Sequence, residues 1–445
     1  MRPALLVVVA VLATACGSSG SDDAGAPSPT EPTDGTAPAE PATEGGEPVR
    51  VLMPERAAPS AAPDLAGRAI AAFGWDIYSA SAASTDADSN VVVSPISIAT
   101  ALGMLEPGAN GEALDQLHAL LRIEDPAAWH ASMSSLEQSI EARVAELPGG
   151  GPDDDQDPGE FNANIANGAF VQPGYVFRAD YLEAIGTDYG AVIEELDFFT
   201  DQAAAAERIN EFIADATDDR ITDLVSAADI DPATVLALVN ALVLQASWQA
   251  EFDEAATADH DFHVPDGTAV SIPLMDGRSD RSGQGDGWVA ASKELMGEVS
   301  FDVVLPDEGR FDEVADRIDA VFTEFDAATN PGGRLAMPRF ETRVDVALKD
   351  VLLDVGLTAP FEAGNLLGIA DDPRTVLDNA LHQTWLSVDE SGIEAAAATV
   401  LLMVAVSEPI EQPVEVVLDR PFLFRIVDGP STATLFVGRV MDPTG

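Results

Sequence analysis

Ser94 and His382 are the two residues whose side chains could act together in nucleophilic catalysis. A serine hydroxyl becomes a strong nucleophile when a histidine accepts its proton and a third group orients that histidine. The sequence offers no identifiable acid partner, and it contains no G-x-S-x-G, H-E-x-x-H or Walker motif. We therefore expect a structural hydrogen bond between the two residues, and we predict that the protein is not an enzyme.

Metal binding has little support in the pattern of histidine and cysteine. His260 and His263 lie three residues apart with only aspartates beside them, and Cys16 is the one cysteine of the chain. A protein zinc site needs three or four converging nitrogen, sulfur or oxygen ligands. We predict no metal site, no other cofactor and no disulfide within the chain.

The segment 384–407 is the most unusual stretch. A strand-like lead reaches Val388, an acidic pair and Gly392 follow, and four alanines precede an apolar run with no proline before Pro409. Alternate residues from Ile393 form an apolar face that suits a buried strand, whereas alanine favours helices. The segment can therefore adopt more than one conformation, and a short buried helix or strand is the alternative.

Charge excludes several classes of partner. The chain of 445 residues has 22 Lys and Arg against 77 Asp and Glu, a formal net charge of −55. Such an acidic surface repels nucleic acid, heparin-like polyanions and anionic lipids. We attribute the charge to solubility in a salty habitat, where salt screens the self-repulsion, in preference to a specific cationic ligand.

The first 62 residues have the layout of an export signal followed by a tether. Residues 1–16 combine Arg2, an apolar core and small residues before Cys16, which resembles a lipoprotein signal peptide whose cysteine carries the lipid. Residues 17–62 are rich in Gly, Ser, Pro, Thr and acid, and we expect a disordered tether. The prediction is an extracytoplasmic, secreted protein, lipid-anchored to the cell membrane; an ordinary signal peptide with an incidental cysteine is the alternative.

Residues 63–445 form one expected α+β domain, because no second linker divides them. Helical spacing dominates early and strand patterns dominate late, with Ser94 and Pro95 at the start of one helix. An amphipathic helix is predicted from Val344 to Gly356.

Six short motifs occur in order along this domain. They are N-V-V-V-S-P-I-S at 90–97, V-N-A at 239–241 with Trp248 and Phe252, D-F-H-V at 261–264, L-A-M-P-R-F at 335–340, V-D-E-S-G at 388–392 after Leu381-His382-Gln383, and R-P-F-L-F at 420–424. Together they resemble the serpin family of serine protease inhibitors, here as a bacterial lipoprotein-type member. The resemblance implies a serpin fold, with helices packed around three β-sheets and an exposed reactive-centre loop.

The resemblance also implies roles for individual residues. A target serine protease would cut the loop at Val406–Ser407 and form a covalent acyl complex, and the loop would then insert into the main sheet as a new strand. Ser94, Ser97, Asn240 and His382 match a buried shutter-like cluster under that sheet. The hinge of the loop is matched by Glu390, Gly392, Ile393, Glu394, Ala395, Ala396, Ala397 and Ala398.

The implied function is suicide-substrate inhibition of elastase-, chymotrypsin- or subtilisin-like proteases by a monomer. Val406 suits a small apolar pocket, and no Arg or Lys lies between Asp389 and Asp419. Ile393 stands where the family usually has a small hydroxyl residue or valine, so we expect slower insertion. The alternative is a non-inhibitory, serpin-like extracellular binding protein.

Overall fold

The computed structural model describes residues 4–13, 51–52, 54–146, 161–217, 219–393 and 413–444, with only the backbone described for 4–13 and 51–52. Glu394, the four alanines at 395–398, the bond Val406–Ser407 and Cys16 lie outside the described residues.

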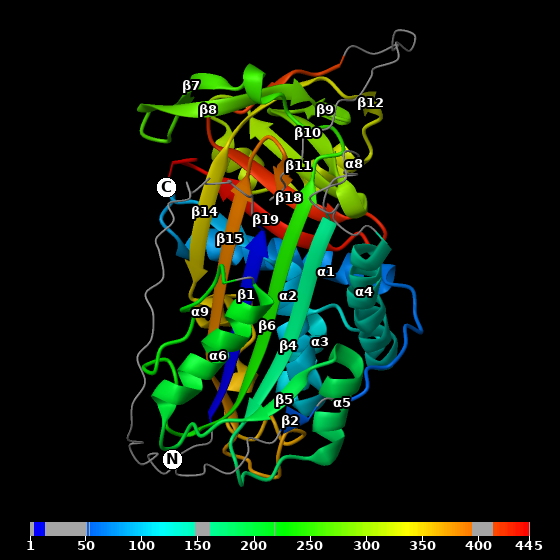
Figure 1. Cartoon of the computed structure of the whole chain (residues 1–445), viewed down its shortest axis with the longest axis vertical. Helices are drawn as coiled ribbons and strands as arrows, with labels where there is room; N and C mark the ends of the chain where they lie inside the picture. Colours follow the sequence, from blue (N-terminus) through cyan, green and yellow to red (C-terminus); the bar gives the residue numbers. More distant parts are fainter. Residues whose placement is uncertain are drawn as a thin grey trace, which may run out of the picture.

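Three β-sheets form the framework of the fold (Figure 1). Sheet A has the order β14-β15-β1-β6-β4-β5-β2, with β16 paired to β6 beside this path; sheet B has the order β12-β9-β10-β11-β18-β19-β3; sheet C has the order β17-β13-β8-β7. The strands of sheet A are β1 (Ala4–Ala13), β2 (Val51–Leu52), β4 (Phe161–Val171), β5 (Val192–Glu195), β6 (Thr234–Ser247), β14 (Phe340–Val346), β15 (Val376–Val388) and β16 (Gly392–Ile393).

Sheets B and C stack above sheet A in Figure 1. Sheet B consists of β3 (Val91–Val93), β9 (Arg281–Gly285), β10 (Trp288–Leu295), β11 (Val299–Pro306), β12 (Asn330–Pro331), β18 (Phe422–Asp428) and β19 (Thr434–Val440). Sheet C consists of β7 (Ala258–His263), β8 (Ala269–Arg278), β13 (Arg334–Pro338) and β17 (Val416–Val417).

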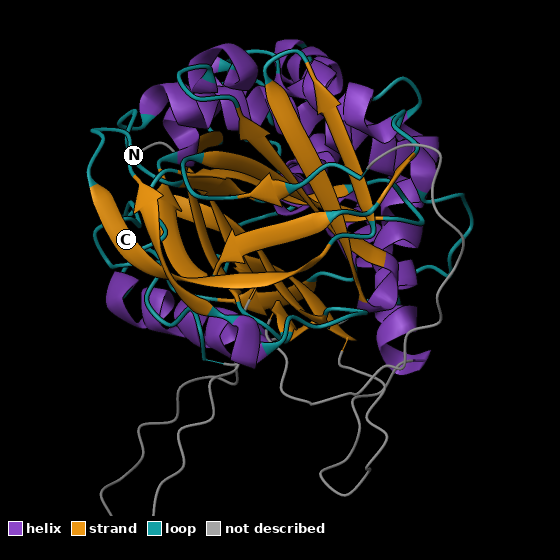
Figure 2. Ribbon diagram, turned by 90° about the horizontal axis from the view of Figure 1, so that it is seen from above, coloured by secondary structure: helices purple, strands orange, loops and turns teal. Residues whose placement is uncertain are grey.

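Helices cover both faces of sheet A, as Figures 1 and 2 show. The helices of the described residues are α1 (Asp64–Ser84), α2 (Pro95–Leu105), α3 (Glu112–Leu120), α4 (Pro126–Glu146), α5 (Ala179–Tyr189), α6 (Gln202–Ala216), α7 (Phe311–Ala315), α8 (Ile318–Asp326) and α9 (Leu348–Asp354). None of these helices is both long and apolar enough to cross a membrane.

Strand β6 is buried along its whole length because helices pack on both of its sides. Its odd-numbered residues, among them Val239 and Val243, join the apolar cluster beneath α6, and its even-numbered leucines, such as Leu238 and Leu242, join the main core. This alternation is the period of two of a β-strand. It sets Asn240 on the face toward α2.

Helix α2 is buried throughout and lies against that face of the sheet. The Ser94 side chain accepts a hydrogen bond from the Ser97 amide and so caps the helix, and Pro95 occupies the first turn, where no amide donor is required. The start predicted from the sequence is therefore confirmed.

The prediction of a helix from Val344 was wrong for its first residues, 344–347. Residues 340–346 form β14, which pairs antiparallel with β15, and α9 begins only at Leu348. Phe340 and Thr342 are buried on alternate positions, so pairing with a neighbouring strand overrides the helical pattern.

The last part of the predicted tether lies against the domain. Val51 and Leu52 pair with β5 as the edge strand β2. The Ala57 amide donates a hydrogen bond to α5, and the carbonyls of Ala57 and Ala62 accept hydrogen bonds from side chains of α4. The predicted tether therefore does not extend as disordered chain to residue 62, because specific polar contacts hold its last residues against the domain.

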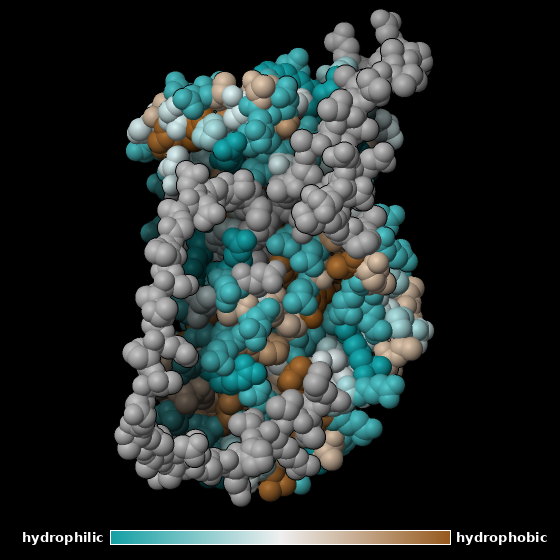
Figure 3. Space-filling view, viewed as in Figure 1, coloured by the Kyte–Doolittle hydropathy of each residue, from teal (hydrophilic) through white to brown (hydrophobic). Residues whose placement is uncertain are grey.

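The described surface is mostly hydrophilic. In the described part of the face drawn in Figure 3, hydrophilic residues predominate and apolar residues occur in small groups.

Candidate functional site

The chain reverses direction where β15 ends. After Val388, residues 389–391 form a turn, and β16 then runs antiparallel to β6, with Gly392 opposite Ser247 and Ile393 opposite Ala246. The segment that follows β15 therefore already points into sheet A on the side of β6. This is the beginning of the predicted hinge.

Backbone and carboxylate hydrogen bonds hold the turn. Asp389 Oδ1 accepts from the Ser391 amide at 2.9 Å and from the Gly392 amide at 3.2 Å. The Trp248 indole donates to the Asp389 carbonyl at 2.9 Å, and the Trp248 amide donates to the Ser391 carbonyl at 2.9 Å. Burial raises the pKa of Asp389, although the two amide donors oppose this shift.

Glu390 is clamped beside the turn. Its side chain is almost fully buried. Its carboxylate accepts hydrogen bonds from Arg339 Nε at 2.9 Å, from Arg339 Nη2 at 2.7 Å and from the Thr257 hydroxyl at 2.6 Å. Burial raises the pKa of Glu390, but the hydrogen bonds from Arg339 and Thr257 outweigh it, so the pKa lies below its ordinary value. The sequence motifs contained Arg339 but gave no sign of this partner.

The two residues of β16 leave no spare room. A Cβ on Gly392 would lie 2.7 Å from Ser247 Cα and closer still to the Ala246 carbonyl oxygen, so the position requires glycine. Ile393 is completely buried and belongs to the main core.

Three members of the predicted shutter-like cluster meet beneath the sheet. The Ser94 amide donates to His382 Nε2 at 3.1 Å, and the Ser94 and Ser97 hydroxyls are 3.2 Å apart. Because Nε2 accepts a hydrogen bond, the ring proton is on Nδ1. Nε2 is thus occupied by an amide and does not activate the Ser94 hydroxyl, and all three residues are buried away from any substrate.

Asn240, the fourth member, lies across the sheet and bonds to a residue that sequence analysis missed. Its side-chain amide donates to Asn167 Oδ1 at 2.8 Å, and Asn167 stands directly opposite on β4. The one asparagine of β6 carries no sequence signal that names its partner.

One strand position separates the two halves of the cluster. Strand β1 fills it, parallel to β15 and to β6, and the backbone of Val9 lies opposite both His382 and Asn240. Residues 4–13 fall within the segment that the sequence predicts to be a removable signal peptide. Sheet A therefore has room for one strand between β15 and β6, and β16 stands at the end of that position.

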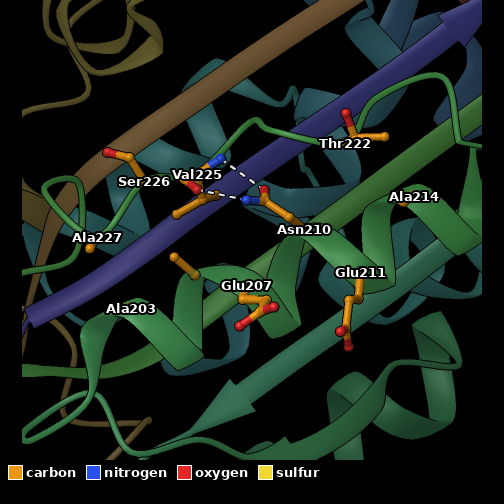
Figure 4. A pocket seen from close by; sticks show the side chains of 10 residues that line it. Ala203, Glu207, Asn210, Glu211, Ala214, Thr222, Val225, Ser226 and Ala227 are labelled. Atoms are coloured by element: carbon orange, nitrogen blue, oxygen red, sulfur yellow. Dashed lines mark hydrogen bonds between the residues drawn. The ribbon is translucent and has the colours of Figure 1, made fainter.

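A surface hollow lies between α6 and the loop at 222–227 (Figure 4). Asn210 bridges it by accepting from the Val225 amide at 2.9 Å and donating to the Val225 carbonyl at 2.7 Å. Alanines, Glu207 and Glu211 line much of the rest. The Ser226 hydroxyl in its lining donates to the Asp229 carboxylate at 2.6 Å, but no histidine is among its described lining residues, so the hinge is the better candidate.

His260 and His263 lie on β7, where His260 Nδ1 contacts the Asp261 carbonyl oxygen at 2.9 Å. Within the described parts of the chain, no three metal-ligating side chains converge.

Comparison with known proteins gives the family. A family model described as serpin (serine protease inhibitor) matches residues 68–443. The chain belongs to the serpin family. An uncharacterized serpin-like protein of Thermococcus kodakarensis is 31% identical over 383 residues, which cover 84% of this serpin and 85% of that protein. This relative is archaeal, and the bacterial lipoprotein subtype stays a prediction.

Solved serpin structures share the fold. The thermophilic serpin tengpin, in its native state, superposes with a TM-score of 0.74 at 22% identity, covering 88% of this chain and 97% of that one. Human thyroxine-binding globulin superposes with a TM-score of 0.71 at 23% identity, covering 86% and 100%. The predicted serpin fold is confirmed.

Proposed function

We propose that this serpin inhibits serine proteases as a suicide substrate. The protease serine would attack the carbonyl carbon of Val406, the amine of Ser407 would leave, and the acyl ester would be trapped when the freed loop inserts into sheet A. The observation that supports this most is β16, which already lies antiparallel to β6 at the end of a position one strand wide.

The register of β16 extends naturally into that position. Gly392 pairs with Ser247 and Ile393 with Ala246, so each later residue would pair one residue earlier in β6. On this register Ala397 would lie opposite Leu242, and Thr399 would lie opposite Asn240. Small or apolar residues would then face the main core, and the Thr399 hydroxyl would arrive between the polar side chains of Asn240 and His382.

The reactive bond Val406–Ser407 implies a protease with a small apolar primary pocket. We propose an elastase-, chymotrypsin- or subtilisin-like target. A trypsin-like enzyme is disfavoured because the segment between Asp389 and Asp419 contains no Arg or Lys.

We further propose that the protein works outside the cytoplasm as a monomer, held on the membrane by lipid on Cys16 after removal of residues 1–15. The leader pattern and the Pro-, Gly- and Ser-rich composition of the following residues support this anchor. The net charge of −55 argues against activation by heparin-like polyanions and against nucleic-acid partners.

The decisive experiment mixes the protein with an elastase-like protease and separates the products on a denaturing gel. We expect a covalent adduct of inhibitor fragment and protease that survives boiling. Mass determination of the released peptide gives the reactive bond. Complete cleavage without adduct at every protease ratio would contradict inhibition.

That second outcome would favour a binding function. Human thyroxine-binding globulin, which shares this fold, binds thyroxine, so a non-inhibitory extracellular binding protein is the second candidate. It predicts clean cleavage of the loop and no trapped protease.

A further inference from the structure

The residues just before the domain form a docked arm, which we define as residues 51–62 without residue 53. Val51 and Leu52 add an antiparallel strand to the free edge of β5. Pro54 then packs on α5, where a Cβ on Gly186 would lie 2.6 Å from Pro54 Cβ. The arm ends against α4, where the Ser132 hydroxyl donates to the Ala62 carbonyl at 2.6 Å. One short segment thus ties a sheet strand to two helices.

Arg56 makes the charged contact of the arm. Its guanidinium pairs with Glu137 and, at 2.9 Å, with Glu141, both on α4. The Glu137 side chain is completely buried, whereas Arg56 remains 19% exposed at the surface. A buried carboxylate is stable only with a counter-charge and hydrogen-bond donors. Arg56 is the only cation paired with Glu137 among the described residues.

Glu137 connects the arm to the strands that border the insertion position. The Thr100 hydroxyl of α2 donates to Glu137 Oε1 at 3.1 Å, and the Asn167 amide of β4 approaches Oε2 at 3.4 Å. Asn167 Oδ1 in turn accepts from Asn240 on β6. Arg56, Glu137, Asn167 and Asn240 therefore form a continuous polar path from the surface to the edge of that position.

Few contacts hold the arm to the domain. On its N-terminal side it continues into the Pro-, Gly- and Ser-rich residues 17–50. Beyond the strand pairing, its contacts are a few hydrogen bonds, the packing of Pro54 and the ion pairs of Arg56.

We propose that the arm is a releasable latch on sheet A, whose groove of β5, α5 and α4 binds an extended segment carrying one arginine that pairs with Glu137. When docked, the arm fixes β5 to α4 and α5, so movement of this half of the sheet must break it. When released, it leaves Glu137 without a cation beside Asn167 and Asn240. The effect on loop insertion rests on the proposed function, whereas docking itself does not.

The pH dependence has a definite sign. Burial raises the pKa of Glu137 to about 7, and Arg56 opposes this shift. Docking of Arg56 favours the ionised form, so by linkage the arm binds more tightly as the pH rises through this range. The other titratable groups that face Glu137 are Glu141 on the same helix and Tyr189 on α5; Thr100 and Asn167 are neutral. Tyr189 stays protonated because burial holds its pKa well above the ordinary value.

Hydrogen exchange of the intact protein tests the latch without any protease. The reporters are the Ala57 amide, which donates to the Thr187 carbonyl at 2.9 Å, and the amides of β2 and β5. After correction for intrinsic rates, we expect their protection to fall from pH 8 to pH 6, by up to about tenfold per pH unit. Glu137→Gln should abolish this pH dependence, because the isosteric amide does not titrate.

Arg56→Gln should leave the arm poorly protected at both pH values. Its matched control is Arg68→Gln, which removes the same charge from an exposed arginine that pairs with Asp64 on the surface of α1 and should behave as the wild type. Equal protection at pH 6 and pH 8 in the wild type, or equal protection in the two arginine variants, would overturn the latch.

The consequence for the sheet is measured separately. With an elastase-like protease, Arg56→Gln should change the ratio of covalent adduct to cleaved inhibitor relative to Arg68→Gln, and an unchanged ratio would refute coupling to insertion. If no variant forms an adduct, the proposed inhibitory function fails while the exchange result still decides whether the arm is a latch.

Discussion

Gly392→Ala is the sharpest test of the hinge, because it adds one methyl group where the backbone of β6 leaves no space. The new Cβ would lie 2.7 Å from Ser247 Cα, against the 3.4–4 Å of ordinary contact. Both neighbours belong to the backbone of a fully buried strand, so β6 cannot move aside.

The expected cost follows from which element gives way. Overpacking of this kind costs about 1–3 kcal/mol, and each backbone hydrogen bond of β16 contributes only about 0.5–1.5 kcal/mol. Full detachment would give up these hydrogen bonds and also the burial of Ile393, which contributes about 1.5–3 kcal/mol, so it costs at least as much as the clash. We expect β16 to shift away from β6 while the rest of the domain stays folded, with the free energy of unfolding lowered by about 1–3 kcal/mol.

Two measurements report this change. The Trp248 amide, which donates to the Ser391 carbonyl, should exchange about tenfold faster, since 1.4 kcal/mol is a factor of ten. The fraction of protease trapped as adduct should fall, because insertion would begin from a displaced hinge.

Ser391→Ala is the control, because the Ser391 hydroxyl has no hydrogen bond among the described residues while its backbone contacts remain. If Gly392→Ala matches this control in Trp248 exchange and in adduct yield, the close approach of β16 to β6 is not what starts insertion.

Three further predictions concern the same hinge. Ala397→Arg should turn the inhibitor into a plain substrate, because insertion would bury an unpaired charge opposite Leu242 at a cost of several kcal/mol; a gel that still shows full adduct would refute the register. Cleavage of the loop should raise the thermal unfolding midpoint by about 10 °C or more, since several apolar side chains become buried, and calorimetry that finds no rise would contradict a strained native state. Glu390→Gln should lower the free energy of unfolding by about 1–2 kcal/mol at neutral pH, after discounting for the exposure of Arg339. The Glu390 pKa is depressed in the fold, so this stabilisation is present above the unfolded pKa of about 4.3 and is lost as the pH falls through the folded pKa; denaturation at pH 7 and pH 3 should show a difference between wild type and variant only at pH 7.

Much of the fold was available in the sequence because its signals are local and ordered. The cap formed by Ser94, the apolar run of β6 and the acidic turn before Gly392 each depend on neighbouring residues, and their order along the chain predicted the serpin fold. The hinge composition was equally local: small residues follow one glycine, whatever the rest of the molecule does.

Partners distant in the chain were decided only by tertiary structure. Nothing near Arg56 indicates that it pairs with Glu137, and nothing near Asn240 indicates Asn167, because these contacts join residues that only the folded sheet brings together. The same reason explains why residues 340–346 form a strand and not the expected helix: their pattern fits either, and the free edge of β15 selects the strand.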